Sequence, residues 1–286
     1  MTDSALTDIE SLIEEALEAA IADAIGPSTP PTLAKALRHA VFPGGGRLRP
    51  QLCLLVAISE SGNGSPPPDA VHAAAAIELL HCASLVHDDL PCFDDAALRR
   101  GVPAVHRMFG EPLAVLVGDA LIVQAFREAA HGPRADALVK TLSDAAGSLR
   151  GIVAGQAWES EPVVALDEYH RAKTASLFEA AATMGAIAAC RDPERWRELG
   201  EALGRAYQAA DDIADAIGST AVLGKPVGQD DANARPSVVR SLGLEGARCY
   251  LAKLVEQASA SARRGGGGQL LDDWLDRVAA RVGVLQ

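Results

Sequence analysis

Apolar residues recur at three- and four-residue intervals along almost the whole chain, in segments rich in Ala, Leu and Glu. This spacing is the period of an α-helix, and no segment competes with it by alternating every second residue as a strand does. Glycine and proline clusters such as 42–46 separate the segments. The expected helices span residues 4–26, 31–42, 48–59, 69–88, 111–130, 134–160, 166–190 and 194–217, with shorter ones from 236 onward and a last one after 265–268. We therefore expect an all-α protein.

Two of the expected helices are apolar around most of their circumference. They contain the runs AAAAIELLHCASLV and LFEAAATMGAIAAC. Helices of this kind lie in the middle of a bundle, with other helices around them. Because no internal linker interrupts the chain, we expect a single domain over residues 1–286, which is long enough to bury a sizeable core.

Composition excludes several classes of protein. A charged fraction of 22% and a mean hydropathy of +0.10 argue against disorder and against a multi-span membrane protein, and we expect no apolar run that approaches a membrane span. The net charge of −12 argues against a nucleic-acid partner. The acidic N-terminus lacks the pattern of a signal peptide, and the five cysteines show neither metal-ligand spacing nor a disulfide framework. A reducing cytoplasm fits these features best.

The sequence HDDLPCFDD places four carboxylates at the end of an otherwise apolar helix: Asp88, Asp89, Asp94 and Asp95. A second cluster occurs in YQAADDIADAIG, where Asp211, Asp212 and Asp215 are spaced so that they converge on one side of a helix. Clustered carboxylates repel one another unless a divalent cation or a basic group neutralises them. Mg²⁺ prefers such oxygen ligands and commonly shares them with phosphates, so the motifs indicate a phosphorylated substrate.

Basic residues that could bind phosphate lie close to these motifs. They are Arg47, Arg49, Arg99, Arg100, Lys173, Lys225 and Arg235. A third DDxxD sequence begins at Asp272, but it follows a glycine tract at a helix start, where acidic residues simply complement the helix dipole. His87 beside Asp88 could be read as a metal-hydrolase pair, yet no partner ligands with clear spacing accompany it.

These motifs together resemble those of the trans-isoprenyl diphosphate synthases, or polyprenyl synthetase family. The segments that carry the resemblance are PGGGRLRP, IELLHCASLVHDDLPCFDDAALRRG, GDALI, GQ at 155–156, YHRAKTASLF, YQAADDIADAIG and LGKPVGQDDANARPS. The glycine-rich turn and the first motif look especially like the geranylgeranyl diphosphate synthases of bacterial carotenoid and bacteriochlorophyll pathways. The resemblance implies a helical bundle around a central cavity, a homodimer, and three Mg²⁺ ions that hold an allylic diphosphate.

The resemblance also implies roles for individual residues. Asp88, Asp94 and Asp211 look like the magnesium ligands, supported by Asp89, Asp212 and Asp215. The allylic diphosphate would be bound by Arg99, Lys173 and Lys225, and isopentenyl diphosphate by Arg49, His81 and Arg100. Thr174 and Gln208 would line the reacting centre. Taken alone, His81 on an apolar helix would be read as a core histidine.

The chain departs from the family pattern at three positions. Gly46 stands where the family commonly has a lysine that binds isopentenyl diphosphate, Gln229 replaces a second lysine, and Arg235 replaces a third. These changes would lower phosphate affinity unless other groups compensate.

Product length in this family depends on side-chain bulk one to two helical turns before the first motif. Ala83 and Ser84 are small and lie five and four residues before Asp88, with Leu79 and Leu80 deeper as a candidate floor. We expect a C20 product, geranylgeranyl diphosphate, with the C15 farnesyl product as the second candidate.

Two rival functions have the same helical pattern: a non-catalytic regulatory subunit and a terpene cyclase. The intact acidic motifs disfavour the regulatory subunit. Asp211 and Asp215, in place of the Asn/Ser/Glu second motif that is usual in cyclases, disfavour the cyclase.

Overall fold

The computed structural model describes residues 2–217, 237–281 and 283, and most of these residues are helical. The expected all-α class is therefore confirmed. The elements are α1 (Thr2–Ala24), α2 (Pro31–Val41), α3 (Leu48–Ser61), α4 (Pro68–Asp88), β1 (Leu98–Arg99), β2 (Val102–Pro103), α5 (Val105–Phe109), α6 (Glu111–Ala129), α7 (Ala135–Ala146), α8 (Ile152–Trp158), α9 (Leu166–His170), the π-helix η1 (Arg171–Ala175), α10 (Ser176–Ala188), α11 (Glu194–Ile217), α14 (Val238–Gly265) and α15 (Gln269–Arg281).

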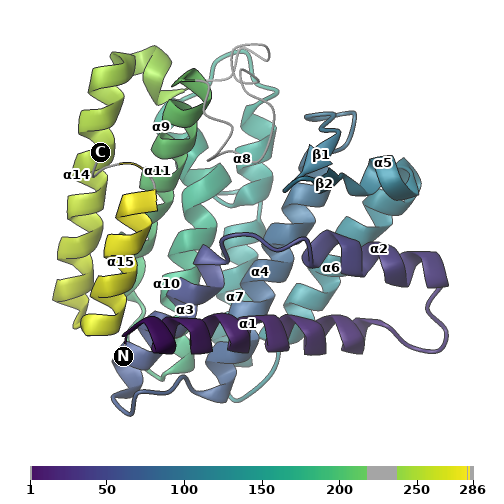
Figure 1. Cartoon of the computed structure of the whole chain (residues 1–286), viewed down its shortest axis with the longest axis horizontal. Coiled ribbons are helices and arrows are strands. Elements are labelled where there is room, and N and C mark those ends of the chain that lie inside the picture. The colour runs from purple at the N-terminus through teal and green to yellow at the C-terminus, as the bar shows by residue number, and fades with distance from the viewer. Residues whose placement is uncertain (1, 218–236, 282, 284–286) are drawn as a thin grey trace.

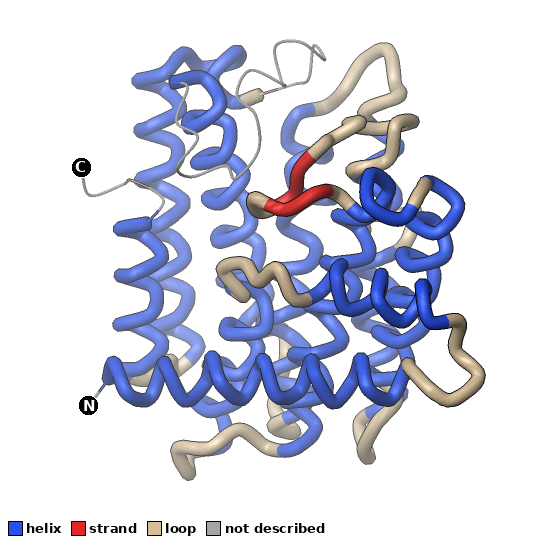
Figure 2. The backbone as a smooth tube through the Cα atoms, turned by 45° about the vertical axis from the view of Figure 1, so that its right-hand side comes forward, coloured by secondary structure: helices blue, strands red, loops and turns tan. Residues whose placement is uncertain are grey.

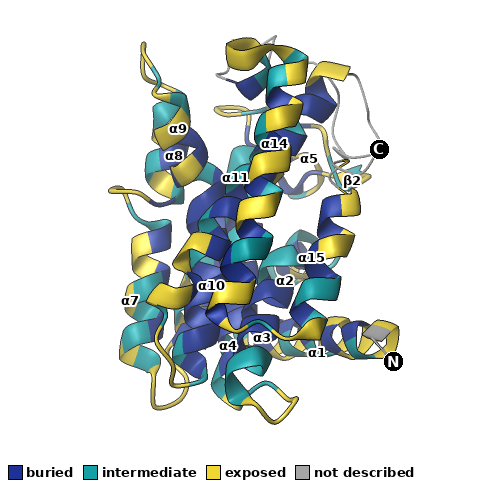
Figure 3. Ribbon diagram, turned by 90° about the vertical axis from the view of Figure 1, so that its left-hand side faces the viewer, coloured by how far each residue is buried: buried dark blue, intermediate teal, exposed yellow. Residues whose placement is uncertain are grey.

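The long helices stand side by side in a bundle, and α1 lies across one end of it (Figures 1 and 2). The two helices with the apolar runs, α4 and α10, pack against each other and against α3 in the interior. Figure 3 shows the buried residues gathered in this central layer, while the outer helices expose one face. Helices α3, α4 and α10 contain many buried alanines. Because alanine side chains are small, the helix backbones approach closely and leave little space for large side chains between them.

By length and composition alone, α4 is long and apolar enough to cross a membrane. The expectation that no apolar run approaches a membrane span is therefore corrected for this helix. However, 67% of its most apolar stretch is buried inside the protein. Neighbouring helices already cover its apolar surface, as in the core helix of a bundle.

Helix boundaries agree with the sequence except where glycines or long-range contacts intervene. The single helix expected over 134–160 is wrong: it is divided into α7 and α8, because the backbone is extended at Gly147 (φ −72°, ψ 179°) and again at Gly151 (φ −96°, ψ −172°). After 236, α14 consists of a short helical segment and a longer one, separated by non-helical backbone at Gly243 (φ 70°, ψ 167°), so more than one helix follows as expected, although the second is long. The sequence pattern does not predict the two-residue hairpin β1–β2 or the short helix α5.

Candidate active site

The first acidic motif folds back on the end of α4. The backbone N–H of Asp94 donates to the carbonyl of Asp88 at 2.9 Å, and that of Asp95 to the carbonyl of Leu90 at 3.1 Å. This tight loop returns the Asp94 side chain to Asp88, whereas Asp95 forms an exposed ion pair with Arg107 at 2.8 Å. Of the second Asp pair in the motif, only Asp94 therefore lies beside Asp88.

A third carboxylate, Glu159, completes this cluster. Oxygens of Asp88, Asp94 and Glu159 all lie within 4.8 Å of one another. Lys173 contacts Glu159 directly, and its Nζ lies 3.6 Å from Asp88 Oδ1. Glu159 also accepts hydrogen bonds from the Tyr169 hydroxyl at 2.7 Å and from Gln156 Nε2 at 3.0 Å. Sequence reasoning missed Glu159, because it lies 71 residues from Asp88 in a segment without an acidic motif.

The π-helix η1 carries Lys173 and Thr174 into this region. The wider turn of a π-helix reorients side chains within an otherwise continuous helix, and such turns are frequent at functional sites. Gly155 of α8 packs directly on η1: a Cβ at this position would lie 2.4 Å from the Lys173 backbone. The GQ sequence at 155–156 thus allows the close approach that brings Glu159 beside Lys173.

The second acidic motif is connected to η1 by hydrogen bonds. The Thr174 hydroxyl donates to Gln208 Oε1 at 2.6 Å, and Gln208 Nε2 donates to Asp212 Oδ1 at 2.9 Å. The other oxygen of Asp212 accepts from the backbone N–H of Val238 at 2.7 Å. Asp212 therefore holds α11 to the start of α14. Asp215 is also buried, while Asp211, on the same helix, is half-buried.

Asp89 is paired with Arg99 from the hairpin. Arg99 Nε donates to Asp89 Oδ1 at 2.9 Å, and Arg99 Nη2 lies 4.0 Å from Asp88 Oδ2. Burial raises the pKa of Asp89, and Arg99 partly offsets this effect. Burial opposes the charge of Arg99, but the pairing with Asp89 outweighs it and raises the pKa of Arg99. The hairpin thus places one cation directly beside the first motif.

A basic cluster lies beside the acidic one. Arg49 Nη1 is 3.3 Å from His81 Nε2, and the Arg49 guanidinium lies over the Phe178 ring at 4.5 Å from its centroid. Burial, with the positive charges of Arg49 and Arg100, holds the pKa of His81 well below its usual range. Burial also lowers the pKa of Arg49. Arg49 Nε is buried and has no hydrogen-bond partner within the described residues. An anion would relieve this concentration of positive charge.

The glycine-rich turn brings two more guanidinium groups to this cluster. Arg100 donates to the carbonyl of Gly44, and its guanidinium carbon lies 2.5 Å from where a Gly45 side chain would begin. Arg281 of α15 approaches the next residue: a Cβ on Gly46 would stand 3.0 Å from Arg281 Nη1. An arginine from the C-terminal end of the described chain therefore lies beside the position where Gly46 replaces the family lysine. Sequence reasoning missed Arg281.

Arg47 does not belong to the phosphate-binding cluster that the sequence indicates. Its side chain is 5% exposed and donates to Glu78 at 2.7 Å, to Glu14 at 2.8 Å and to the carbonyl of Val41 at 2.8 Å. Glu78 is itself only 1% exposed in the middle of α4. Arg47 therefore connects α1, α2 and α4, and the expectation that it binds phosphate is corrected.

The remaining predicted residues lie in several places. Ala83 and Leu80 are buried in the core, and the Ser84 hydroxyl donates to the His81 carbonyl of its own helix. The His87 ring lies against α6, 3.3 Å from the Val115 carbonyl, so it does not join the acidic cluster. Asp272 lies in the first turn of α15 as expected. Residues Lys225, Gln229 and Arg235 lie outside the described part of the chain.

The acidic cluster fits a magnesium site. Asp88 Oδ1 is buried and, within the described residues, accepts no hydrogen bond. Lys173 Nζ, 3.6 Å from this oxygen, is too far to donate a hydrogen bond, so the buried carboxylate oxygen is left unsatisfied, and a bound cation would satisfy it. The donor set of three carboxylates consists of the hard oxygens that Mg²⁺ prefers.

Comparison with known proteins agrees with this geometry. The sequence model described as "Polyprenyl synthetase" matches residues 30–264. The chain belongs to the polyprenyl synthetase family. It is 50% identical over 278 residues to the geranylgeranyl diphosphate synthase of Cereibacter sphaeroides, covering 96% of each chain, and 49% identical over 259 residues to that of Rhodobacter capsulatus, covering 88% of this chain and 89% of the relative.

Solved structures support the same family. The geranyltransferase of Legionella pneumophila has a TM-score of 0.82 at 26% identity, covering 100% of this chain and 99% of that one. The Helicobacter pylori geranyltransferase, solved with magnesium and isoprenyl diphosphate, has a TM-score of 0.77 at 31% identity, covering 94% and 96%. The resemblance seen in the sequence is thus confirmed, as is the enzyme class of the trans-isoprenyl diphosphate synthases. Enzymes of this polyprenyl synthetase family depend on magnesium in general.

Proposed function

We propose that this chain is a magnesium-dependent prenyltransferase that condenses isopentenyl diphosphate with allylic diphosphates to form geranylgeranyl diphosphate. The observation that carries the proposal is the cluster of three carboxylates, Asp88, Asp94 and Glu159. One oxygen of this cluster, Asp88 Oδ1, is buried and accepts no hydrogen bond within the described residues. The relatives named above as geranylgeranyl diphosphate synthases support the C20 product.

Both acidic motifs serve the allylic substrate. Asp88, Asp94 and Asp211 hold magnesium, for which we propose three ions, and Asp89, Asp212 and Asp215 support these ligands. Glu159 adds a carboxylate beside the first motif and keeps Lys173 in place through their direct contact. Lys173 and Arg99 bind the allylic diphosphate, and Lys225 contributes a further cation. Magnesium, when bound, neutralises the charge that develops on the departing diphosphate.

The basic cluster binds isopentenyl diphosphate. Arg49, His81 and Arg100 present donors from three different elements, and the unpartnered Nε of Arg49 is available to a phosphate oxygen. Arg281 supplies the positive charge that a lysine at position 46 would otherwise provide, because its guanidinium lies beside that position. Arg235, in place of a further family lysine, belongs to the same proposed set.

The reacting centre lies between the two diphosphates. Thr174 and Gln208 are hydrogen-bonded to each other and, through Asp212, to the start of α14, so their side chains are held in fixed positions. The buried Phe178 ring stacks under Arg49 and excludes water from this side. A dry, rigid centre protects the allylic cation, formed when the diphosphate departs, from attack by water.

Product length follows from the small residues one to two turns before the first motif. Ala83 and Ser84 leave room beside α4 for a growing chain, and Leu80 with Leu79 forms the floor. The Ser84 hydroxyl is turned onto its own helix, so it adds little bulk to this side. The C15 product is the outcome if a side chain from a neighbouring helix closes the same space.

A homodimer is the proposed assembly. Leu116 and Val123, seven residues apart on one face of α6, are 55% and 68% exposed. Exposed aliphatic residues along one helix face are typical of an interface between subunits. Leu116→Glu with Val123→Glu should yield monomers in sedimentation velocity, whereas Val163→Glu on an exposed loop should not. Unchanged sedimentation of the double variant would place the interface elsewhere.

A cytoplasmic location fits the described cysteines. All five are free thiols, and Cys53 and Cys82 are buried in the core. Thiols of this kind persist in a reducing compartment.

One assay tests the reaction and its product together. The purified chain is incubated with Mg²⁺, isopentenyl diphosphate and each of the C5, C10 and C15 primers, and the dephosphorylated products are sized. We expect C20 and loss of activity with EDTA. A cyclic hydrocarbon would indicate a terpene cyclase, and turnover only with an added partner would indicate a regulatory subunit.

Three substitutions assign the acidic motifs. Asp88→Ala and Asp211→Ala should lower kcat by roughly 10²–10³-fold while the protein stays folded. Asp272→Ala is the matched control, because this aspartate lies in a similar sequence at the first turn of α15 and should leave activity unchanged. Equal damage from Asp272→Ala and Asp211→Ala would show that the second motif is wrongly assigned.

A further inference from the structure

A second group of potential metal ligands lies far from the active site. It consists of His72 in the first turns of α4, Glu128 at the end of α6 and His131 just after α6. His72 and Asp88 are on the same helix, and the 16 residues between them correspond to roughly 24 Å. This group is therefore separate from the catalytic carboxylates at the other end of α4.

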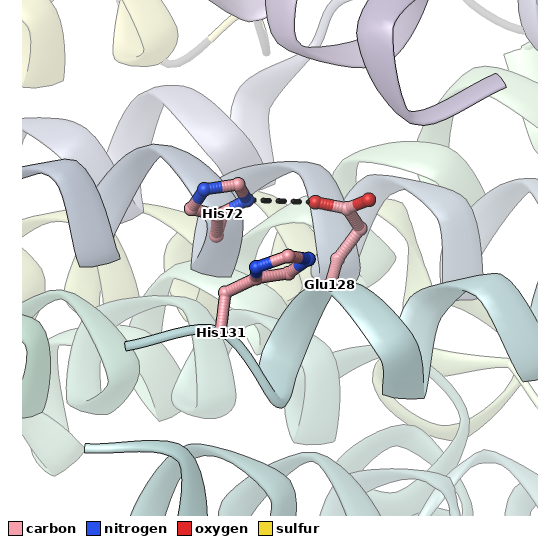
Figure 4. A group of neighbouring side chains, drawn as sticks. All are labelled: His72, Glu128 and His131. Atoms are coloured by element: carbon pink, nitrogen blue, oxygen red, sulfur yellow. Dashed lines mark hydrogen bonds and ion pairs between the residues drawn. The ribbon is translucent and has the colours of Figure 1, made fainter. Parts of the chain in front are cut away.

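The three side chains converge on one point between the two helices. Figure 4 shows both imidazole rings beside the Glu128 carboxylate, with the Nδ1 of His72 hydrogen-bonded to Glu128 Oε2 at 2.8 Å. The rings of His72 and His131 are stacked, with centroids 4.3 Å apart and planes at 13°. One ligand atom from each residue lies within 4.8 Å of the other two.

These distances suit a small tetrahedral ion. Ligand atoms at about 2.0–2.1 Å from Zn²⁺ lie about 3.3 Å apart, so the stacked rings must turn out of parallel for one nitrogen of each to point at the ion. His131 is exposed and His72 is half-exposed, which leaves a fourth ligand position open to water. Two imidazoles and one carboxylate are zinc ligands, whereas Mg²⁺ prefers six oxygens.

The surroundings hold Glu128 ready for this role. Its carboxylate is 7% exposed, and Gln124 Nε2 donates to Oε1 at 3.0 Å, which leaves Oε2 directed at His72. A hydrogen bond to the outer oxygen of a ligating carboxylate is the usual support of a metal site. Asp69 lies against Gly132, next to His131, and adds negative charge that favours a cation.

We propose that His72, Glu128 and His131 form a Zn²⁺ site that joins α4 to α6. The ion binds His72 Nδ1, one imidazole nitrogen of His131 and Glu128 Oε2, and so replaces the hydrogen bond between His72 and Glu128. Its function is structural: it fixes the start of α4, the helix whose other end carries Asp88. Without metal, the link between the two helices at this point is the hydrogen bond between His72 and Glu128, with His131 stacked on the His72 ring.

The experiment uses tag-free full-length protein, stripped of metal and returned to millimolar Mg²⁺, which occupies the carboxylate sites. Zn²⁺ is then added, and the melting temperature and the heat of binding are measured. At a free Zn²⁺ concentration a hundredfold above Kd, we expect one ion per chain and a rise in Tm of roughly 5 °C. Co²⁺ should give the visible absorption bands of a tetrahedral nitrogen and oxygen site.

His131→Ala is the decisive variant, because this side chain is exposed and its loss should not disturb folding. It should abolish the Tm rise and the Co²⁺ bands, while prenyltransferase activity remains that of the wild type. His39→Ala, which removes a histidine remote from the group, should keep both signals. A wild-type chain that does not respond to Zn²⁺, or an equal response in His131→Ala, would overturn the proposal. Neither result would affect the proposed prenyltransferase function.

Discussion

Arg47 and Arg49 are two residues apart, yet the structure gives them opposite roles. Arg47→Met removes the hydrogen bonds to three partners, Glu78, Glu14 and the Val41 carbonyl, from a side chain that is 5% exposed. It leaves Glu78, 1% exposed, as an unpaired charge in the core. We predict that this change destabilises the fold without altering substrate binding.

The size of the effect follows from the burial of the pair. Breaking a buried ion pair by removing one partner costs about 3–5 kcal/mol, since the remaining charge has no compensation. This is a large part of the roughly 5–15 kcal/mol by which proteins are typically stable. Replacing both residues, with Arg47→Met and Glu78→Leu together, removes the stranded charge and should bring stability back to within about 1 kcal/mol of the wild type.

Arg49→Met is the matched comparison. Arg49 makes no ion pair with a carboxylate in the described residues and carries an unpartnered Nε, so its removal should change the free energy of unfolding little. It should instead raise KM for isopentenyl diphosphate by roughly 10–150-fold, the equivalent of about 1.5–3 kcal/mol of charge-assisted hydrogen bonding.

Urea unfolding followed by circular dichroism gives the stabilities, and steady-state kinetics gives KM. If Arg47→Met kept wild-type stability and raised KM, Arg47 would be a substrate ligand and the assignment from its burial would be wrong. If the double variant were as unstable as Arg47→Met alone, the stranded charge of Glu78 would not be the cause.

Substitutions at the glycine-rich turn, the wall of α4 and the buried histidine should each have a distinct effect. Gly46→Lys should not lower KM for isopentenyl diphosphate, because a Cβ at this position lies 3.0 Å from Arg281 Nη1. Arg281→Ala should raise this KM. The double variant, in which the lysine replaces the lost arginine, should have the KM of the wild type. Ala83→Tyr should shift the product from C20 to C15, and a variant that still makes C20 would show that Ala83 does not set the length. The folded-state pKa of His81 lies below its unfolded value of 6.5, so the unfolded state gains the proton first and stability falls as pH drops below 6.5. His81→Gln should remove this loss from urea unfolding curves measured between pH 7.5 and pH 5.5, because the variant has no imidazole to protonate.

The positions of the helices and the chemistry that they carry can be predicted from the amino-acid sequence alone. Helical periodicity and chain breakers depend on neighbours within a few residues, so the predicted bounds of α2, α3, α4, α6 and α11 lie close to the observed ones. The motif around Asp88 is readable for the same reason: its loop closes within the motif, through the hydrogen bond from Asp94 to the Asp88 carbonyl.

Which side chains meet depends on the tertiary packing. Glu159 joins Asp88 because Gly155 lets α8 pack on the π-helix, and neither the close approach nor the wider turn has a local sequence signature. The basic turn around Arg47 predicts a phosphate ligand, but a left-handed backbone (φ 45°) directs its side chain toward Glu78 in the core.

Contacts between residues far apart in the sequence likewise cannot be predicted from local sequence patterns. Arg281 reaches Gly46 from the last described helix, and His72 meets Glu128 across 56 residues. Local propensity fixes where a helix begins and ends, whereas the partners of its side chains depend on how helices distant in sequence pack together. The sequence therefore predicts the enzyme's class and its acidic motifs, and the packing of the bundle determines the full set of ligands around them.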